Sequence, residues 1–322
     1  MSNKTEANLS DCLINFTESN YVSSVNRVID FIDDNIEYDL TLTSISDVAN
    51  YSEYHFHRIF KSFTREPLKQ YIKRIRIEKA AVQLINNPFK SITQIAYDNG
   101  FSSSQFFSRA FKQNFGISPC EWRRRRNSNI IISGELNELF NNDSEKLQEL
   151  KDFYVEINDV IPNTAVVIQE THEMDVAYIR HIGSYVENAG IYHKLFNKLM
   201  NWADSYGYMD SETKLIALFN DYPGITEKNK QKAMLCITVP QYAKTSRVIE
   251  KTKIPGGKYA VAHFELPEDK VIRAWEFMYG KWLPESGFQE DDRHAFAWII
   301  NNPFEHPSRL FSFNIYLPVK SL

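Results

Sequence analysis

Apolar positions in the first third of the chain recur at helical spacing, in two similar copies. Each copy begins with a hydroxyl residue suited to capping a helix, Thr41 or Ser91. Apolar residues then follow three or four apart, which is typical of a short helix with one buried face. Each stretch ends at a residue type that readily adopts the left-handed backbone conformation, Asn50 or Gly100. A second capping serine follows, so the pattern predicts helix, tight turn and helix, twice over.

The second helix of each copy has one apolar face and one polar face. Phe56, Ile59 and Phe60 of the first copy correspond to Phe107, Ala110 and Phe111 of the second. In a helix-turn-helix the second helix enters the major groove of DNA, where Arg and Gln side chains can pair with guanine and adenine edges. The residues predicted on the outer faces are Tyr54, His57, Arg58 and Lys61 in the first copy, and Gln105, Ser108, Arg109 and Lys112 in the second.

A single long helix is predicted between the two copies, over Leu68 to Asn86. Its apolar residues share a helical spacing, and Asn87-Pro88 ends it because proline disfavours helical geometry at the preceding residue. A stiff spacer of this kind fixes the separation of the two reading helices. To enter one face of B-DNA they should lie about 34 Å apart, so one chain would read two adjacent major-groove segments.

The charge distribution supports nucleic-acid binding. Between Tyr51 and Asn127 there are fifteen basic and five acidic residues, a net charge of +10 in a chain whose formal net charge is −4. Such a block of one sign is characteristic of a DNA- or RNA-binding surface. A basic amphipathic helix could instead bind a membrane surface or a partner protein, but neither needs a short capped helix directly before it.

The second half of the chain predicts an α+β domain. Hydrophobicity alternates with period two over residues 165–168, 176–182, 235–239, 259–264 and 311–317, and helical stretches cover 189–206 and 268–283. Their order suggests two β-α-β-β repeats that form one antiparallel sheet with a cleft between the helices, a frequent place for ligands. The predicted fold class is therefore multidomain, with an all-α double helix-turn-helix domain followed by this α+β domain.

Residues Val22 to Arg126 resemble the DNA-binding domain of AraC/XylS-type transcription regulators. The resemblance rests on Ile95 to Ser102, on Phe107 to Lys112, and on Gly116-Ile117-Ser118-Pro119. It implies that Tyr54, His57 and Arg58 contact bases from the first reading helix, and that Ser104, Gln105, Ser108 and Arg109 do so from the second. The first unit departs modestly from the family at Ser46, Asn50 and Arg65.

The second half resembles the GyrI-like effector-binding domain found in Rob-like regulators. The resemblance rests on the segments 178–185, 221–223, 254–260 and 282–287. It implies a small-molecule effector held between aromatic rings. This sequence has Ala297 where the family has a pocket Glu, and Ile299 where a Tyr is common, so Glu187 or Glu276 would have to supply any acid. We therefore expect an aromatic or amphipathic, and neutral, ligand.

The candidate effector residues are five aromatic side chains of the second half. Any one of them could instead belong to the core, and the set is suggestive only as a group. They are Tyr185, Tyr222, Trp275, Tyr279 and Trp298.

The expected organisation is a polar tail over 1–20, the DNA-binding domain over 21–127, a linker over 128–151 and the effector domain over 152–322. Three widely spaced cysteines and the lack of a secretion signal or long apolar run favour a cytoplasmic protein without disulfides and without membrane contact.

No catalytic motif, metal-ligand spacing or cofactor loop stands out. We expect no enzymatic activity and no cofactor. The expected partners are double-stranded DNA, a small molecule and RNA polymerase. Alternatives for the second half are a small-molecule hydrolase and a protein-binding module.

Overall fold

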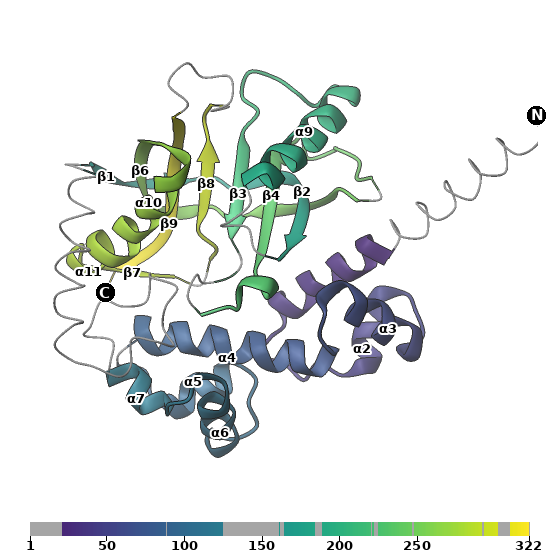
Figure 1. The fold of residues 1–322 in the computed structure, drawn as a ribbon, viewed down its shortest axis with the longest axis vertical. Coiled ribbons are helices and arrows are strands. Elements are labelled where there is room, and N and C mark those ends of the chain that lie inside the picture. The colour runs from purple at the N-terminus through teal and green to yellow at the C-terminus, as the bar shows by residue number, and fades with distance from the viewer. Residues whose placement is uncertain are drawn as a thin grey trace, which may run out of the picture.

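The computed structural model describes residues 21–87, 89–124, 161, 164–183, 189–219, 221, 225–246, 248–291, 293–301 and 310–321. A helical half comes first and a sheet half follows it (Figure 1). The expected tail over 1–20 and linker over 128–151 lie outside the described residues.

The helical half contains the two helix-turn-helix units and the spacer that the sequence predicts. A helix over residues 21–34 precedes them. Thr41 and Ser91 each accept a hydrogen bond from the backbone N–H three residues on, and Asn50 and Gly100 have φ of 58° and 72°. The remaining helices are α2 (Leu42–Ala49), α3 (Glu53–Thr64), α4 (Leu68–Asn86), α5 (Ile92–Asp98), α6 (Ser104–Phe115) and α7 (Pro119–Arg124).

Helix α4 is buried on several sides because it contacts three parts of the molecule. Its first half packs with the first unit in a cluster that includes Phe56, Phe60 and Tyr71. Its second half packs with the second unit in a cluster that includes Leu84 and Phe107. The sheet half lies along its remaining side (Figure 1). This explains why polar side chains are buried on α4 as well as apolar ones.

The sheet half is one antiparallel sheet made of two β-α-β-β repeats. The repeats are β2-α9-β3-β4 and β6-α10-β8-β9, and β3 pairs with β8 so that Ala217 lies opposite Ala297. The strand order is β1-β6-β9-β8-β3-β4-β2-β5, with β7 paired to β9. The strands are β1 (Val166–Thr171), β2 (Met174–Ile182), β3 (Leu215–Phe219), β4 (Lys232–Thr238), β5 (Glu250–Ile254), β6 (Gly257–Leu266), β7 (Phe288–Glu290), β8 (Phe296–Ile299) and β9 (Phe311–Ser321).

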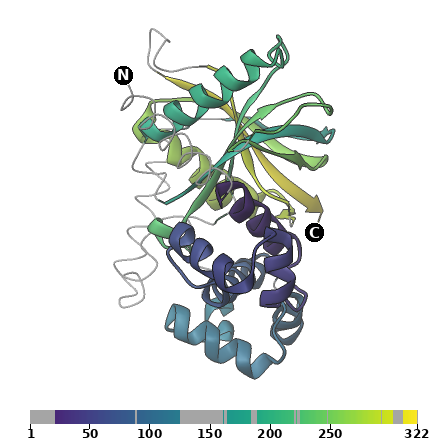
Figure 2. The same cartoon turned by 90° about the vertical axis from the view of Figure 1, so that its right-hand side faces the viewer.

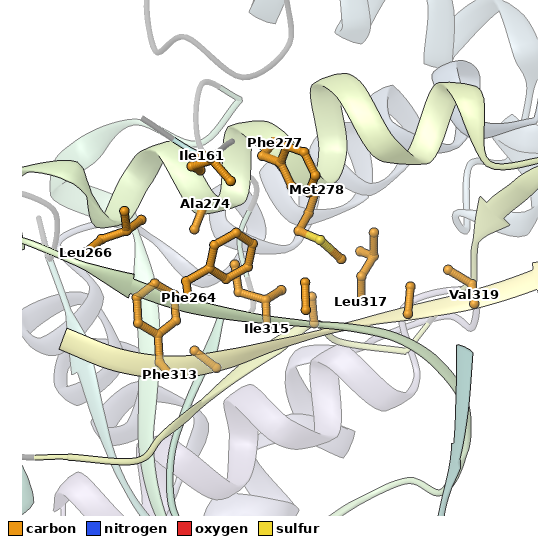
Figure 3. Close-up of a cluster of buried hydrophobic side chains, with 14 residues drawn as sticks. Ile161, Phe264, Leu266, Ala274, Phe277, Met278, Phe313, Ile315, Leu317 and Val319 are labelled. Atoms are coloured by element: carbon orange, nitrogen blue, oxygen red, sulfur yellow. The ribbon is translucent and has the colours of Figure 1, made fainter. Parts of the chain in front are cut away.

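The two faces of the sheet bury different cores. One face is covered by α9 (Ala189–Ser205) and by α10 (Val271–Glu276) with its continuation; Figure 3 shows Phe277 and Met278 above Phe264, Ile315 and Leu317. The other face carries a second cluster from the alternate strand positions, as period two requires. The helix over residues 21–34 lies beneath the strands (Figure 2).

Two features differ from the expectation. Strand β5 was not predicted because Glu-Lys-Thr-Lys-Ile offers little apolar alternation, and its place at the sheet edge explains that polar pattern. The helix expected over 268–283 is not uniform. After α10 it continues as a π-helical turn over Phe277–Trp282 and ends in α11 (Leu283–Glu285), where Pro284 cannot donate to the hydrogen-bond ladder.

Candidate functional sites

The outer face of α3 presents the polar side chains predicted for the first reading helix. Tyr54 is 76% exposed, Arg58 and Lys61 are exposed, and His57 is partly exposed. The guanidinium of Arg58 lies 5.9 Å from the centre of the Tyr54 ring. Phe56, Ile59 and Phe60 are buried on the opposite face, so packing of the apolar face turns the polar face to solvent.

Helix α6 presents the corresponding face of the second unit. Gln105, Arg109 and Lys112 are exposed, while Ser104 and Ser108 are partly exposed. Ser103 caps the helix by accepting from the Phe106 N–H, and Gly116 ends it with φ of 76°. Ser52, at the corresponding position of α3, makes no such cap hydrogen bond, contrary to the expectation. The two units thus offer matching polar faces on helices of equal length, 12 residues each.

Arg76 joins the two units across the spacer. Its guanidinium donates to the carbonyl oxygens of Ile36 at 3.0 Å, of Gly100 at 2.8 Å and of Tyr38 at 2.6 Å. Ile36 and Tyr38 precede the first unit, and Gly100 is the turn residue of the second. A Cβ at Gly100 would lie 2.6 Å from the Ile36 oxygen, so only glycine fits this approach. The orientation of one unit relative to the other is therefore fixed by more than α4 itself.

The predicted effector residues Trp275 and Tyr279 lie together on the helical side of the sheet. Their rings stack with centroids 6.3 Å apart, and Phe219 meets Trp275 edge-on at 5.2 Å. Phe219 and Ile299 pack against the cores of both repeats. We call the group formed by Phe219, Trp275, Tyr279 and Ile299 the seam, since it lies where the two repeats meet.

Phe219 is a seam residue that the sequence interpretation did not single out. It ends β3 and faces α10, far along the chain from Trp275. A usable signal existed, because the uninterrupted apolar run from Leu215 to Phe219 is typical of a buried strand, in which every second side chain shares a face. The covering helix cannot be identified from that run.

Trp298 does not join the other two described candidates. It packs with the cluster on the opposite face of the sheet, and Lys214 Nζ lies 4.5 Å from the centre of its ring. Ala297, its neighbour in β8, faces the helical side, so the position where the resemblance expects a pocket Glu does face the core beneath α10. Tyr185 and Tyr222 lie outside the described residues, as does Glu187.

An acidic side chain near the seam is already paired. Glu276 is 5% exposed, and Arg273 Nη1 donates to its carboxylate at 2.7 Å. Burial raises the pKa of Tyr192, on α9, above its ordinary value. The described residues of the seam are thus aromatic and aliphatic. Two buried carboxylates lie beside it: Glu276, which pairs with Arg273, and Glu290, which accepts a hydrogen bond from the Tyr279 hydroxyl.

Buried charges connect the sheet half to the first unit. The side chain of Lys232, on β4, is 1% exposed and donates to Asp33 Oδ2 at 3.3 Å and to the Tyr71 hydroxyl at 3.0 Å. Arg180, on β2, pairs with Asp30, and the Tyr178 hydroxyl donates to the same carboxylate at 2.5 Å. Asp221 accepts from the backbone N–H of Lys232.

A second buried cluster lies at the middle of α4. Arg74 donates to the carboxylates of Glu66 and Glu78, and the Thr226 hydroxyl donates to Glu78 at 2.9 Å. Burial raises the pKa of Glu78 to about 7, although Arg74 opposes the shift. Burial likewise raises the pKa of Asp221 to about 6, against the effect of Lys232. The neighbouring Asp221 carboxylate adds to the effect of burial, so both favour the protonated form of Glu78.

Within the described part of the chain, no group of three or more His, Cys, Asp and Glu side chains is arranged to hold a metal ion. None of the described helices combines the length and apolar character needed to cross a bilayer. Neither observation adds a site to the two surfaces above.

Comparisons with known proteins match both halves. Residues 45–125 match a family described as a helix-turn-helix domain, and residues 164–320 match the GyrI-like small-molecule-binding domain. The regulatory protein SoxS of Salmonella typhimurium is 33% identical over 101 residues, which cover 31% of this chain and 94% of SoxS. The chain belongs to the AraC-type transcription regulators.

Other relatives of this AraC-type regulator match the same region. YkgA of Escherichia coli K12 is 35% identical over 99 residues, which cover 31% of this chain but only 41% of YkgA. A solved AraC-type regulator from Chromobacterium violaceum is 30% identical with a TM-score of 0.31, covering 32% of this chain and 92% of that one. This AraC-type regulator therefore shares its helix-turn-helix half with SoxS and YkgA, and its sheet half is GyrI-like.

Proposed function

We propose that the protein reads two adjacent major-groove segments of one duplex through α3 and α6. The supporting observation is that two helices of equal length present matched polar faces and are joined by α4 and Arg76. The proposed base contacts are made by Tyr54, His57, Arg58, Ser104, Gln105, Ser108 and Arg109. Lys61 and Lys112 lie one turn further along each helix and contact phosphates, which position the protein without reading sequence.

The DNA proposal is tested with a duplex selected from a random pool by the full chain. We expect Arg58→Ala and Arg109→Ala each to weaken binding by about 1–3 kcal/mol and to relax preference at one base pair. Lys61→Ala and Lys112→Ala should weaken all sequences similarly and lower the slope of log affinity against log salt by about 1 each. Lys253→Ala, an exposed change in the sheet half, is the control. Parent-like binding by both folded arginine variants would overturn the assignment.

We further propose that the sheet half binds a small neutral aromatic or amphipathic effector at the seam. The support is the stacked pair Trp275 and Tyr279 with Phe219 across from it, and the pairing of Glu276 with Arg273. A cation would find aromatic ring faces there, but Glu276 is paired with Arg273 and both oxygens of Glu290 already accept hydrogen bonds, from Tyr279 and Asn86. Trp298 is dropped from the proposed site because its side chain lies on the other face of the sheet.

The effector proposal is tested with 1-aminoanthracene, a neutral aromatic dye whose fluorescence rises in apolar surroundings. We expect the parent to bind it, Trp275→Ala to bind it at least several-fold more weakly, and Trp298→Phe to bind it as the parent does. Equal loss in the two variants would place the site elsewhere.

We also propose that the protein acts at promoters in the cytoplasm together with RNA polymerase, as its membership of a transcription-regulator family suggests.

A further inference from the structure

One carboxylate lies between the seam and the spacer helix. Glu290, on β7, is 6% exposed. Its Oε1 accepts a hydrogen bond from the Tyr279 hydroxyl at 2.8 Å, and its Oε2 accepts one from Asn86 Nδ2 at 2.8 Å. Tyr279 belongs to the seam, and Asn86 is the last residue of α4.

The chain of contacts is short and stiff. Trp275 stacks on Tyr279, Tyr279 bonds to Glu290, and Glu290 bonds to Asn86. Both hydrogen bonds are 2.8 Å long and meet on one buried carboxyl group, so they restrain it from both sides. Tyr279 also lies in the π-helical turn, an element often found where a helix carries a functional side chain.

Helix α4 transmits the position of Asn86 to the second reading helix. Asn86 is followed by the short connection to α5, and the second half of α4 packs in one core with Phe107 and Phe111 of α6. Lys73, also on α4, donates to Gln113 of α6 at 3.2 Å. A movement of Asn86 would therefore reposition α6.

We infer that Glu290 is a positioning residue that couples the seam to the second reading helix. This inference rests on the proposed function. A ligand that moves the Tyr279 side chain would change its hydrogen bond to Glu290, and so the hydrogen bond that holds Asn86 at the end of α4. The position of α6 in its groove would change as a result. Because such coupling is reciprocal, duplex bound by α6 must in turn alter the surroundings of Trp275. This reciprocal effect can be measured without knowing the effector.

The test uses the full chain labelled with 5-fluorotryptophan and a duplex selected from a random pool. Trp275 is assigned among the five tryptophans by Trp275→Phe. We expect saturating duplex to shift the fluorine signal of Trp275 in the parent. In Asn86→Ala the shift should be lost although the duplex is bound, because the link between α4 and Glu290 is cut.

The matched control is Asn87→Ala, which removes a neighbouring amide that bonds to the Gln83 carbonyl within the same helix. This variant should keep the shift. Tyr279→Phe should lose it, and since it removes a single oxygen while keeping the ring, it decides the matter if Asn86→Ala fails to fold.

Two results would overturn the inference: a parent that binds duplex with no change at Trp275, or a Tyr279→Phe protein that shows the parent's shift. A parent that binds no duplex from the pool would instead overturn the proposed DNA reading, so the two failures are distinguishable.

Discussion

The two helix-turn-helix units are fastened to the sheet half by different chemistry. The helix leading into the first unit is held by two cations whose side chains are each 1% exposed, Arg180 on Asp30 and Lys232 on Asp33. The α4 segment that carries the second unit is held through neutral donors on carboxylates, Thr226 on Glu78 and Asn86 on Glu290.

This difference in chemistry implies a difference in how much a single substitution costs at each attachment. Removing one partner of a buried ion pair leaves an uncompensated charge and typically costs about 3–5 kcal/mol. Hydrogen bonds from neutral donors to charged groups contribute about 1.5–3 kcal/mol each. We call the first unit the fixed point of the molecule, in the sense that a single substitution in its charged attachment should cost more than one in the attachment of the second unit.

The largest effect is expected from Lys232→Met. The substitution keeps the length of the side chain but leaves Asp33 and Asp221 without their cation, and it should destabilise the protein by about 3–5 kcal/mol. Urea unfolding, monitored by far-UV circular dichroism, measures the decrease in the free energy of unfolding. Lys253→Met removes an exposed pair with Glu173 and should leave the midpoint unchanged. If both variants unfolded alike, the first unit would not be the fixed point.

Much of the helical half could be predicted because its signals are local. Thr41, Ser91, Asn50 and Gly100 cap or end helices within a few residues of themselves, and α4 runs over Leu68–Asn86 as expected. The outward faces of α3 and α6 follow from spacing alone. Their contact with DNA stays a prediction.

The sheet half was harder to predict because its site depends on contacts between segments that are distant along the chain. Alternation gave the β-α-β-β repeats, but it does not say which face of β8 a helix covers. Trp298 was grouped with Trp275 for that reason, while Phe219 was missed. The buried link from Lys232 to Tyr71 could not be predicted either, since no local pattern marks a lysine that another domain will bury.

The next largest effect tests how the two units are held together. Gly100→Ala places a Cβ 2.6 Å from the Ile36 oxygen and 2.7 Å from Arg76 Cζ, at a φ that disfavours side chains. We expect a loss of about 2–4 kcal/mol from strain and overpacking together. Gly116→Ala has a similar φ of 76° with nothing within 4 Å of the new atom, so it should lose only about 1–2 kcal/mol. Equal losses in the two variants would show that the close contacts of Gly100 with Ile36 and Arg76 are not the reason why glycine is needed there.

A smaller effect is expected from pH, through the carboxylates at the middle of the interface. The pKa of Glu78 is raised by burial to about 7 and that of Asp221 to about 6, so docking of the halves binds protons. The resulting stabilisation is present at low pH and is lost as pH rises through these values.

We therefore expect the parent to lose stability as the pH rises from about 4.5 to 7.5 and to level off above this range, and we expect Glu78→Gln to lose less over the same range. Urea midpoints across this range measure the two slopes. Equal slopes of urea midpoint against pH for the parent and Glu78→Gln would mean that docking of the halves does not change the protonation of Glu78. The control is Glu170→Gln, on the exposed edge strand, which should keep the parent's slope.

The smallest effect concerns the ends of the two reading helices, where the units differ by one residue type. Arg65 ends α3 with φ of 62°, whereas Gly116 ends α6 with φ of 76°. In the left-handed conformation a residue with a side chain is strained by about 1–2 kcal/mol, and glycine removes this strain. Glycine also makes the unfolded chain more flexible, which lowers the free energy of unfolding by about 0.5–1 kcal/mol. Arg65→Gly should therefore stabilise the protein by about 0.5 kcal/mol. Asn50→Gly should change stability less, because asparagine tolerates this conformation. A destabilised Arg65→Gly protein would show that the exposed arginine makes a contact worth more than the strain it bears, and the first unit would then be held by its surface as well as by its buried charges.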